Sequence, residues 1–237
     1  MSSVIYRFRV ADTSLYEYEV SLEPPKPDAR KDVSQPTWTK LAFHQCANCT
    51  LSSDDHPYCP VAVRLPSLVD MANRLHSYDR ITVEVELRER RIIQETTAQR
   101  AVSSLLGLVM ATSECPHMVY LRPMARFHLP LASEEETEYR AASMYLLAQY
   151  YLHREGRSVD LTLKGLTKIY RELQRVNMAL ADRIRAASSQ DTARNAIVLL
   201  DIFAKVVPYS IEGSMQEFQH LFAAYLTALK GNEEIDE

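Results

Sequence analysis

The chain has 237 residues and an ordinary composition, 46% hydrophobic and 24% charged, which excludes wholesale disorder and low-complexity architectures. A chain of this length forms one large domain or two small ones and can bury a core without disulfide bonds. Its 27 basic residues stand against 31 acidic ones, for a net charge of −4, and its five glycines are too widely spaced for the glycine-rich nucleotide-binding loops. We therefore expect no nucleic-acid partner.

Targeting signals are not expected. The first residues alternate between apolar and polar and carry charge by Arg7, which is not the pattern of a signal peptide. No uncharged stretch exceeds the length of Ala101 to Ser113, which is shorter than the roughly 20 residues of a transmembrane helix. We therefore expect a cytoplasmic protein with no transmembrane segment. Thiols stay reduced in that compartment, so the four cysteines are interpreted as metal ligands or redox groups.

Two β-hairpins are predicted in the N-terminal third, because apolar and polar residues alternate there. The alternating stretches are residues 4–10 and 16–22 for the first hairpin, and residues 81–88 and 91–95 for the second. In the first hairpin we expect Arg7 and Arg9 to face Glu17 and Glu19 across the strands, a pairing that sets the register.

From Thr97 onward the apolar spacing becomes helical. Ser133 and Glu136 have the spacing of a capping box, which predicts a helix that begins there and ends near His153. Further helices are predicted from about residue 160, over 192–206 and over 209–229, the last two separated by Pro208. The predicted fold class is α+β: a β-rich, cysteine-bearing part over residues 1–96 packs on a helical bundle over residues 97–237. The two parts are expected to form one compact unit joined through Cys115.

The most informative segment is FHQCANCTLSSDDHPYCP, residues 43–60, together with SECPH further along the chain. Cys46 and Cys49 have the CxxC spacing that turns two thiolates toward one ion, and Cys59 and Cys115 complete a set of four. Thiolates are soft ligands that select zinc, copper(I) or iron–sulfur clusters, and four of them make a closed tetrahedral site. Zinc is the first choice, and an iron–sulfur cluster is the alternative.

Two further features bear on this site. Cys59 and Cys115 each precede a proline, a residue favoured at the first position of a helix, and a helix N-terminus favours the thiolate form. His56 and His117 each lie within three residues of a cysteine and are the alternative ligands. Two interpretations compete with ligation: Cys115 as an inert buried thiol, and histidines that only satisfy a backbone carbonyl.

A second constellation lies in CPHMVYLRPMARFHLP, residues 115–130. If this segment is a helix kinked at Pro123, its histidines share one face and its arginines another. Such a cluster can bind an anionic substrate, with a histidine as acid or base. The candidate residues are His117, Arg122, Arg126 and His128. The alternative is that the arginines pair with the glutamates of residues 134–138 and fix the packing of the next helix.

The runs FHQCANC, CPVAV, TSECPHM and LRPMARFHLP resemble an uncharacterised family of bacterial proteins whose members carry CxNC, CP and SGCP elements. The likeness spans residues 43–210. The resemblance implies a bacterial, soluble origin and a cysteine set that acts as a unit, and it implies no activity.

We therefore expect a metal-binding protein with an accessory or regulatory role, acting with a protein partner. The first alternative is an enzyme that acts on an anionic small molecule through the histidine and arginine cluster. The second alternative is a helical interaction module without metal. The sequence leaves the partner, the substrate and the oligomeric state open.

Overall fold

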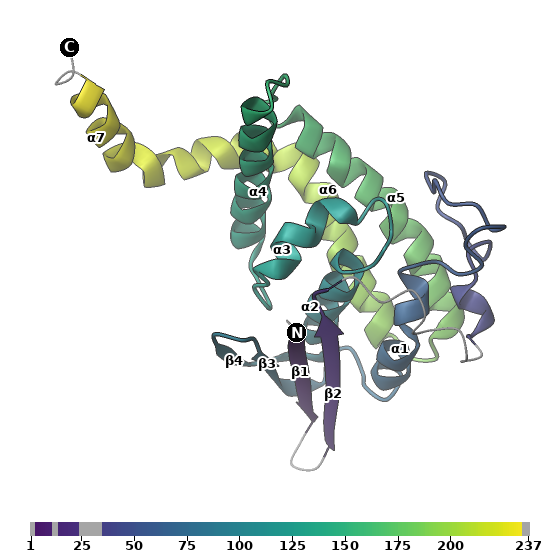
Figure 1. Ribbon diagram of the computed structural model, residues 1–237. Coiled ribbons are helices and arrows are strands. Elements are labelled where there is room, and N and C mark those ends of the chain that lie inside the picture. Colours follow the sequence, from purple (N-terminus) through teal and green to yellow (C-terminus); the bar gives the residue numbers. More distant parts are fainter. Residues whose placement is uncertain (1–2, 11–13, 24–34, 234–237) are drawn as a thin grey trace.

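A computed structural model describes residues 3–10, 14–23 and 35–233, which form an α+β fold (Figure 1). Four strands make one antiparallel sheet in the order β2-β1-β3-β4. They are β1 (Ser3–Val10), β2 (Ser14–Ser21), β3 (Arg80–Glu86) and β4 (Arg91–Thr97). The predicted fold class and both predicted hairpins are confirmed, and the β1–β3 pairing joins the hairpins into one sheet.

The two faces of the sheet differ in chemistry because side chains alternate along each strand. One face is apolar and buried, with Tyr6 and Phe8 of β1 fully shielded from solvent. On the other face the guanidinium of Arg7 lies 2.7, 3.0 and 2.7 Å from carboxylate oxygens of Glu17, Glu84 and Glu86. Ion pairs on an open face stabilise a fold only weakly, so this group sets register more than stability.

The register confirms one predicted cross-strand pair and corrects the other. Arg7 lies opposite Glu17, as expected. Arg9 lies opposite Leu15, and Glu19 lies opposite Ile5, so the predicted pairing of Arg9 with Glu19 is wrong. The reason is that partners in an antiparallel pair run in opposite directions along the chain.

Three short helices lie between β2 and β3 in the chain, and the other helices follow β4. Their bounds are η1 (Thr37–Thr39), η2 (Ala62–Arg64), α1 (Pro66–Ala72), α2 (Ala98–Ala111), η3 (Val119–Leu121), α3 (Arg122–Arg126), α4 (Glu134–Arg154), α5 (Lys164–Ala187), α6 (Thr192–Phe218), η4 (Gln219–Phe222) and α7 (Ala223–Glu233). Helix α2 packs on strands β3 and β4, and α6 packs against both α2 and α5. Figure 1 shows α7 projecting away from this body. In the described parts of the chain, no helix has the length and apolar character needed to cross a bilayer.

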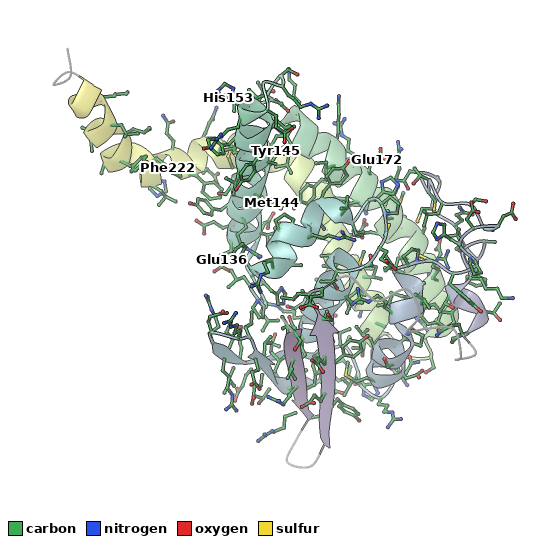
Figure 2. The ribbon with its side chains drawn as sticks, viewed as in Figure 1. Glu136, Met144, Tyr145, His153, Glu172 and Phe222 are labelled. Carbon is green, nitrogen blue, oxygen red and sulfur yellow. The ribbon has the colours of Figure 1, made fainter. Side chains whose placement is uncertain are left out.

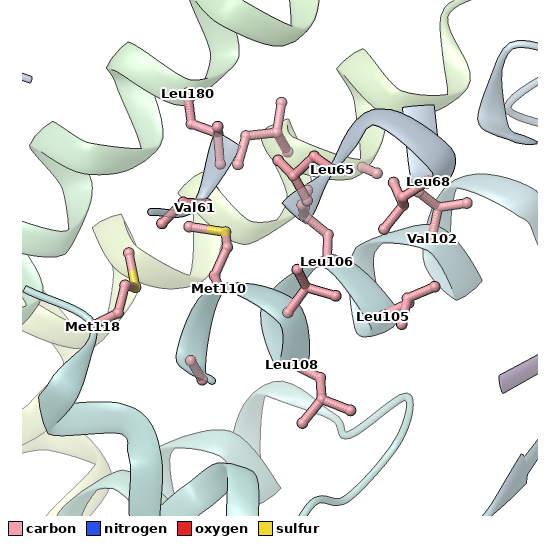
Figure 3. Packing of buried hydrophobic residues seen from close by; sticks show 14 of the residues in the cluster. Val61, Leu65, Leu68, Val102, Leu105, Leu106, Leu108, Met110, Met118 and Leu180 are labelled. Atoms are coloured by element: carbon pink, nitrogen blue, oxygen red, sulfur yellow. The ribbon is translucent and has the colours of Figure 1, made fainter. Parts of the chain in front are cut away.

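One continuous cluster of buried side chains joins the sheet to the helices. Helix α2 lies at its centre: Val102, Leu105 and Leu106 are completely buried. Figure 3 shows these side chains facing Leu65 next to α1, with Leu180 of α5 on the same side of the core. Burial of such side chains contributes roughly 1.5–3 kcal/mol each, so α2 anchors both halves of the chain.

The predicted capping box at the start of α4 is confirmed. The backbone N–H of Glu136 donates to the Ser133 hydroxyl at 3.1 Å, and the backbone N–H of Ser133 donates to the Glu136 carboxylate at 2.7 Å. Two N–H groups that the helix leaves without partners are satisfied in this way.

Two helix predictions are wrong. The break expected at Pro208 does not occur, since α6 runs as one helix over Thr192–Phe218. A proline inside a helix removes one hydrogen bond, which bends a helix without always ending it. Residues 115–130 do not form one kinked helix: a turn at Cys115 leads into η3 and then α3, which ends at Arg126.

Candidate functional site

Three of the cysteines lie in one irregular segment, residues 43–60, here called the cysteine loop. Its base is closed by a short antiparallel pairing, in which the N–H of Cys59 donates to the carbonyl of Thr39 at 2.9 Å and Leu41 donates to Pro57 at 2.9 Å. In the CxxC turn the N–H of Cys49 donates to the carbonyl of Cys46 at 3.0 Å. This hydrogen bond closes the turn between the first two cysteines.

Cys115 reaches the same region from the end of α2. The N–H of Met118 donates to its carbonyl at 2.9 Å, and the N–H groups of His117 and Met118 are directed at its sulfur. Nε2 of His117 lies 2.7 Å from the carbonyl oxygen of Asn48. The Cys115 turn is therefore joined directly to the CxxC turn, although the two lie 69 positions apart in the chain.

The four thiols influence one another electrostatically. Burial raises the pKa of the Cys46 thiol to about 12, and the thiols of Cys59, Cys115 and Cys49 add to that shift. Burial likewise raises the pKa of Cys115, to which Cys59 and Cys49 also contribute. Cys59 and Cys115 are buried, Cys46 and Cys49 are half-buried, and all four are free thiols.

These contacts do not yet amount to a formed ligand set. Within residues 3–10, 14–23 and 35–233, no three side chains of cysteine, histidine, aspartate or glutamate are placed as they would be around a metal ion. The structure thus brings the four predicted cysteines into one neighbourhood.

A buried arginine that the sequence analysis missed lies beside the thiols. Arg183 of α5 is 1% exposed, and it donates to the carbonyls of Trp38, Lys40 and Leu41 at 2.7–2.8 Å. Its charge lowers the pKa of Cys46, opposing the effect of burial there. Its Nε is buried without a hydrogen-bond partner, and among the described residues no carboxylate forms an ion pair with it. The signal was present in the sequence, since Arg183 continues the apolar stripe of α5 that includes Val176 and Leu180.

A second contact from α5 holds the CxxC turn. The side-chain amide of Asn48 donates to a carboxylate oxygen of Glu172 at 2.7 Å and to the Glu172 carbonyl at 3.1 Å. Glu172 lies on the side of α5 that faces the loop (Figure 2). The turn between Cys46 and Cys49 is therefore fixed from both sides, by α5 and by His117.

The two alternative ligands have different surroundings. His56 is exposed on the cysteine loop, and it is absent from the groups that shift the pKa of Cys46 or Cys115. His117 lies next to the CxxC turn, where one ring nitrogen already bonds to the Asn48 carbonyl.

The side chains of the predicted anion cluster have separate partners. Arg122 donates to the carbonyl of Ser113 at 3.3 Å, Arg126 is exposed, and His117 bonds to Asn48. His128 alone of the four lines the apolar cavity between helices α2 to α6 that is described below. The shared helical face predicted for these residues is wrong because the segment is divided into two short helices.

The chain belongs to a protein family described as "Domain of unknown function (DUF6901)", whose model matches residues 4–223. The resemblance to an uncharacterised family is thereby confirmed. Neither a curated protein nor a solved structure matches the chain.

Proposed function

We propose that this family member binds a metal ion through the thiolates of Cys46, Cys49, Cys59 and Cys115, and that the bound ion fixes the cysteine loop against the helices. The observation that carries this proposal is the buried guanidinium of Arg183. It lies beside the thiols, and within the described residues it has carbonyl partners and no carboxylate.

The argument is one of charge. A buried guanidinium costs free energy unless negative charge lies near it, even when carbonyls accept its hydrogen bonds. Four thiolates around a divalent ion carry a net negative charge, which Arg183 would offset. A metal also reverses the effect of burial on the thiols, because a coordinated thiol loses its proton. The N–H groups directed at the sulfur of Cys115 favour the same charged form.

Zinc suits this ligand set best, and an iron–sulfur cluster is the alternative. Four sulfurs satisfy the tetrahedral geometry of a structural zinc site and leave no open position for a substrate. The proposed role is therefore accessory or regulatory, with the ion holding a surface in shape for a protein partner. Four free thiols suit the reducing cytoplasm, which is the location we propose.

Metal analysis and an absorption spectrum of the full chain, purified anaerobically without added metal, test the proposal. We expect about one zinc per chain and a colourless protein. A brown protein with iron and acid-labile sulfide would assign the cluster alternative. Folded protein that contains neither metal, and whose melting temperature a chelator leaves unchanged, would refute the proposal.

Single substitutions then test which side chains are ligands. We expect Cys49→Ser and Cys115→Ser to lower the metal content to a similar extent and to lower the melting temperature, because metal-binding free energy contributes to folding. The matched control is His56→Ala, which should retain the metal. Full occupancy in Cys115→Ser together with loss in His56→Ala would replace Cys115 with His56 in the ligand set.

A further inference from the structure

A second candidate site lies in the helical half of the chain. It is a cavity of about 270 Å³ between α2, α3, α4, α5 and α6, close to the lower end of the roughly 300–1,000 Å³ of small-molecule sites. Most of its lining is aliphatic, and the lining side chains include Leu108, Met110, Leu121, Met124, Leu173 and Leu200. Among the side chains that the structure describes, Tyr170 and His128 contribute the rings of the lining. An alkyl chain suits a cavity with this lining.

The charged groups of the lining have one sign. Arg100 and Arg140 line the cavity, and among the described side chains no aspartate or glutamate lines it. Arg100 is exposed to solvent. Arg140 is half-buried, and burial lowers its pKa while the nearby Tyr170 and Glu136 oppose that effect. The cavity therefore favours an anion over a cation or a neutral molecule.

The guanidinium of Arg140 uses only some of its N–H groups in hydrogen bonds to the described residues. Its Nη2 donates to the carbonyls of Met124 and Phe127 at 3.0 and 2.9 Å. Within the described residues, its Nε and Nη1 groups have no acceptor. A guanidinium offers two parallel N–H groups that match the two oxygens of a carboxylate.

Tyr170 of α5 supplies a second donor next to Arg140. Its side chain is 5% exposed, and its hydroxyl has no hydrogen-bond partner in the described parts of the chain. Burial raises the pKa of Tyr170 to about 12; the charge of Arg140 opposes that effect and the charge of Glu138 adds to it, so the hydroxyl keeps its proton at neutral pH. A hydroxyl that lines a cavity beside a cation is placed to donate to an anion.

We infer that this cavity binds an alkyl monocarboxylate, with the carboxylate held by Arg140 and Tyr170 and the alkyl chain packed against the leucines and methionines of α2, α3 and α6. Arg100 is exposed, and the half-buried guanidinium of Arg140 with the neutral Tyr170 hydroxyl matches one negative charge better than the two of a phosphate monoester. None of the four cysteines lines the cavity, so the site is separate from the proposed metal centre.

The test is isothermal titration calorimetry of the full chain with decanoate, below the concentration at which micelles form. We expect saturable binding of decanoate, and binding of decanol and decylamine weaker by at least about tenfold, since a charge-assisted hydrogen-bonded pair is lost. Equal affinity for decanol would overturn the anion assignment. Tighter binding of 4-phenylbutyrate than of decanoate would overturn the alkyl assignment.

Tyr170→Phe is the decisive variant, because the hydroxyl has no protein partner and its removal should leave the fold intact. We expect an unchanged melting temperature without ligand and about tenfold weaker decanoate binding. Tyr150→Phe, which removes an exposed hydroxyl from α4, is the matched control and should bind as the native protein does. Arg140→Gln should abolish binding. If Arg140→Gln does not fold, Tyr170→Phe still tests the site. Unchanged affinity in Tyr170→Phe would refute the site.

Discussion

The hydroxyl of Tyr6 lies 2.5 Å from Nε2 of His128, which is 122 positions further along the chain. The same hydroxyl lies 2.8 Å from the Ser104 hydroxyl, and Ser104 in turn accepts a hydrogen bond from the N–H of Leu131 at 3.0 Å. Strand β1, helix α2 and the segment that leads into α4 therefore meet at one polar point inside an apolar region. A polar group in such surroundings is stable only while its hydrogen bonds are complete.

His128 gives the fold a specific sensitivity to acid. Burial, with a smaller contribution from the charge of Arg140, lowers the pKa of His128 to about 3. In the unfolded chain a histidine titrates near about 6.5, so on acidification the unfolded state takes up the proton first and the native state loses stability. Between about pH 6.5 and pH 5 this amounts to about 2 kcal/mol, at about 1.4 kcal/mol per pH unit.

The measurement is urea unfolding at pH 7 and pH 5. In His128→Gln, whose amide is neutral at both pH values, we expect the difference between the two free energies of unfolding to shrink by about 2 kcal/mol. His56→Gln on the exposed cysteine loop is the control and should keep the native pH dependence. The same pH dependence in His128→Gln and in the native protein would show that His128 is not buried as a neutral ring.

Arg183 is predicted to be the most sensitive charged position of the fold. In Arg183→Met the carbonyls of Trp38, Lys40 and Leu41 lose their donors inside the protein, which should destabilise it by about 3 kcal/mol or more. Thermal and urea unfolding measure this loss.

Two residues along α5, Arg185 provides the matched control. It is exposed and forms an ion pair with Asp182 within the same helix, so Arg185→Met should change the free energy of unfolding by less than about 0.5 kcal/mol. Similar effects of the two substitutions would contradict the structural role of Arg183. Under the proposed function, only Arg183→Met should also reduce the metal content.

Gly165 near the start of α5 has no room for a side chain. A Cβ there would lie 2.0 Å from the hydroxyl oxygen of Tyr145 and 3.0 Å from the ring carbon that carries it. That hydroxyl donates to Asp160 at 2.9 Å, and Tyr145 faces α5 from α4 (Figure 2). We expect Gly165→Ala to destabilise the protein by about 1–3 kcal/mol, because Tyr145 must move and give up this bond.

The double variant Gly165→Ala/Tyr145→Phe identifies the cause. Removal of the hydroxyl relieves the closest contact, so the two changes together should cost less than the sum of the single changes. Gly107→Ala is the comparison, since its Cβ would meet only the end of the Leu200 side chain, at 3.3 Å. It should stay within about 1 kcal/mol of the native protein, because alanine favours the helix. Additive effects at Gly165 and Tyr145 would refute the steric explanation.

Met118 connects the two proposed sites. Met118 lines the cavity, and its N–H bonds to the carbonyl of Cys115. If both proposals hold, removing the metal with a chelator should loosen this turn and weaken decanoate binding several-fold. Calorimetry before and after chelation measures the effect, with restoration by added zinc as the control. Equal affinities would show that the cavity and the metal centre act independently.

The sequence predicts those features of the fold that depend on short-range patterns. The hairpins follow from strict alternation, and the start of α4 follows from Ser133 and Glu136, three positions apart. The second cross-strand pair was wrong because alternation gives the face of a side chain and leaves its partner across the strand open, and Arg9 meets Leu15. The ends of helices near proline were also missed, since a proline removes one hydrogen bond and packing decides whether the helix continues.

The same distinction between short-range patterns and long-range packing applies to the candidate sites. The cysteine spacing identifies Cys46, Cys49 and Cys59 as one group, because they belong to one loop. The carbonyl partners of Arg183 lie more than 140 positions away, and no local pattern shows which carbonyls a buried arginine will meet. The pairing of Arg140 with Tyr170 depends likewise on how α4 packs on α5.

The large sequence separation between Arg183 and its carbonyl partners also affects when these contacts can form during protein synthesis. The two strands of the first hairpin leave the ribosome almost together and can pair at once. The cysteine loop emerges soon afterwards, but the carbonyls of Trp38, Lys40 and Leu41 at its base lack their Arg183 donor until α5 has been translated. For most of translation the four thiols therefore belong to an unfinished chain, so a nascent protein stalled before α5 exposes reactive cysteines that the completed protein shields.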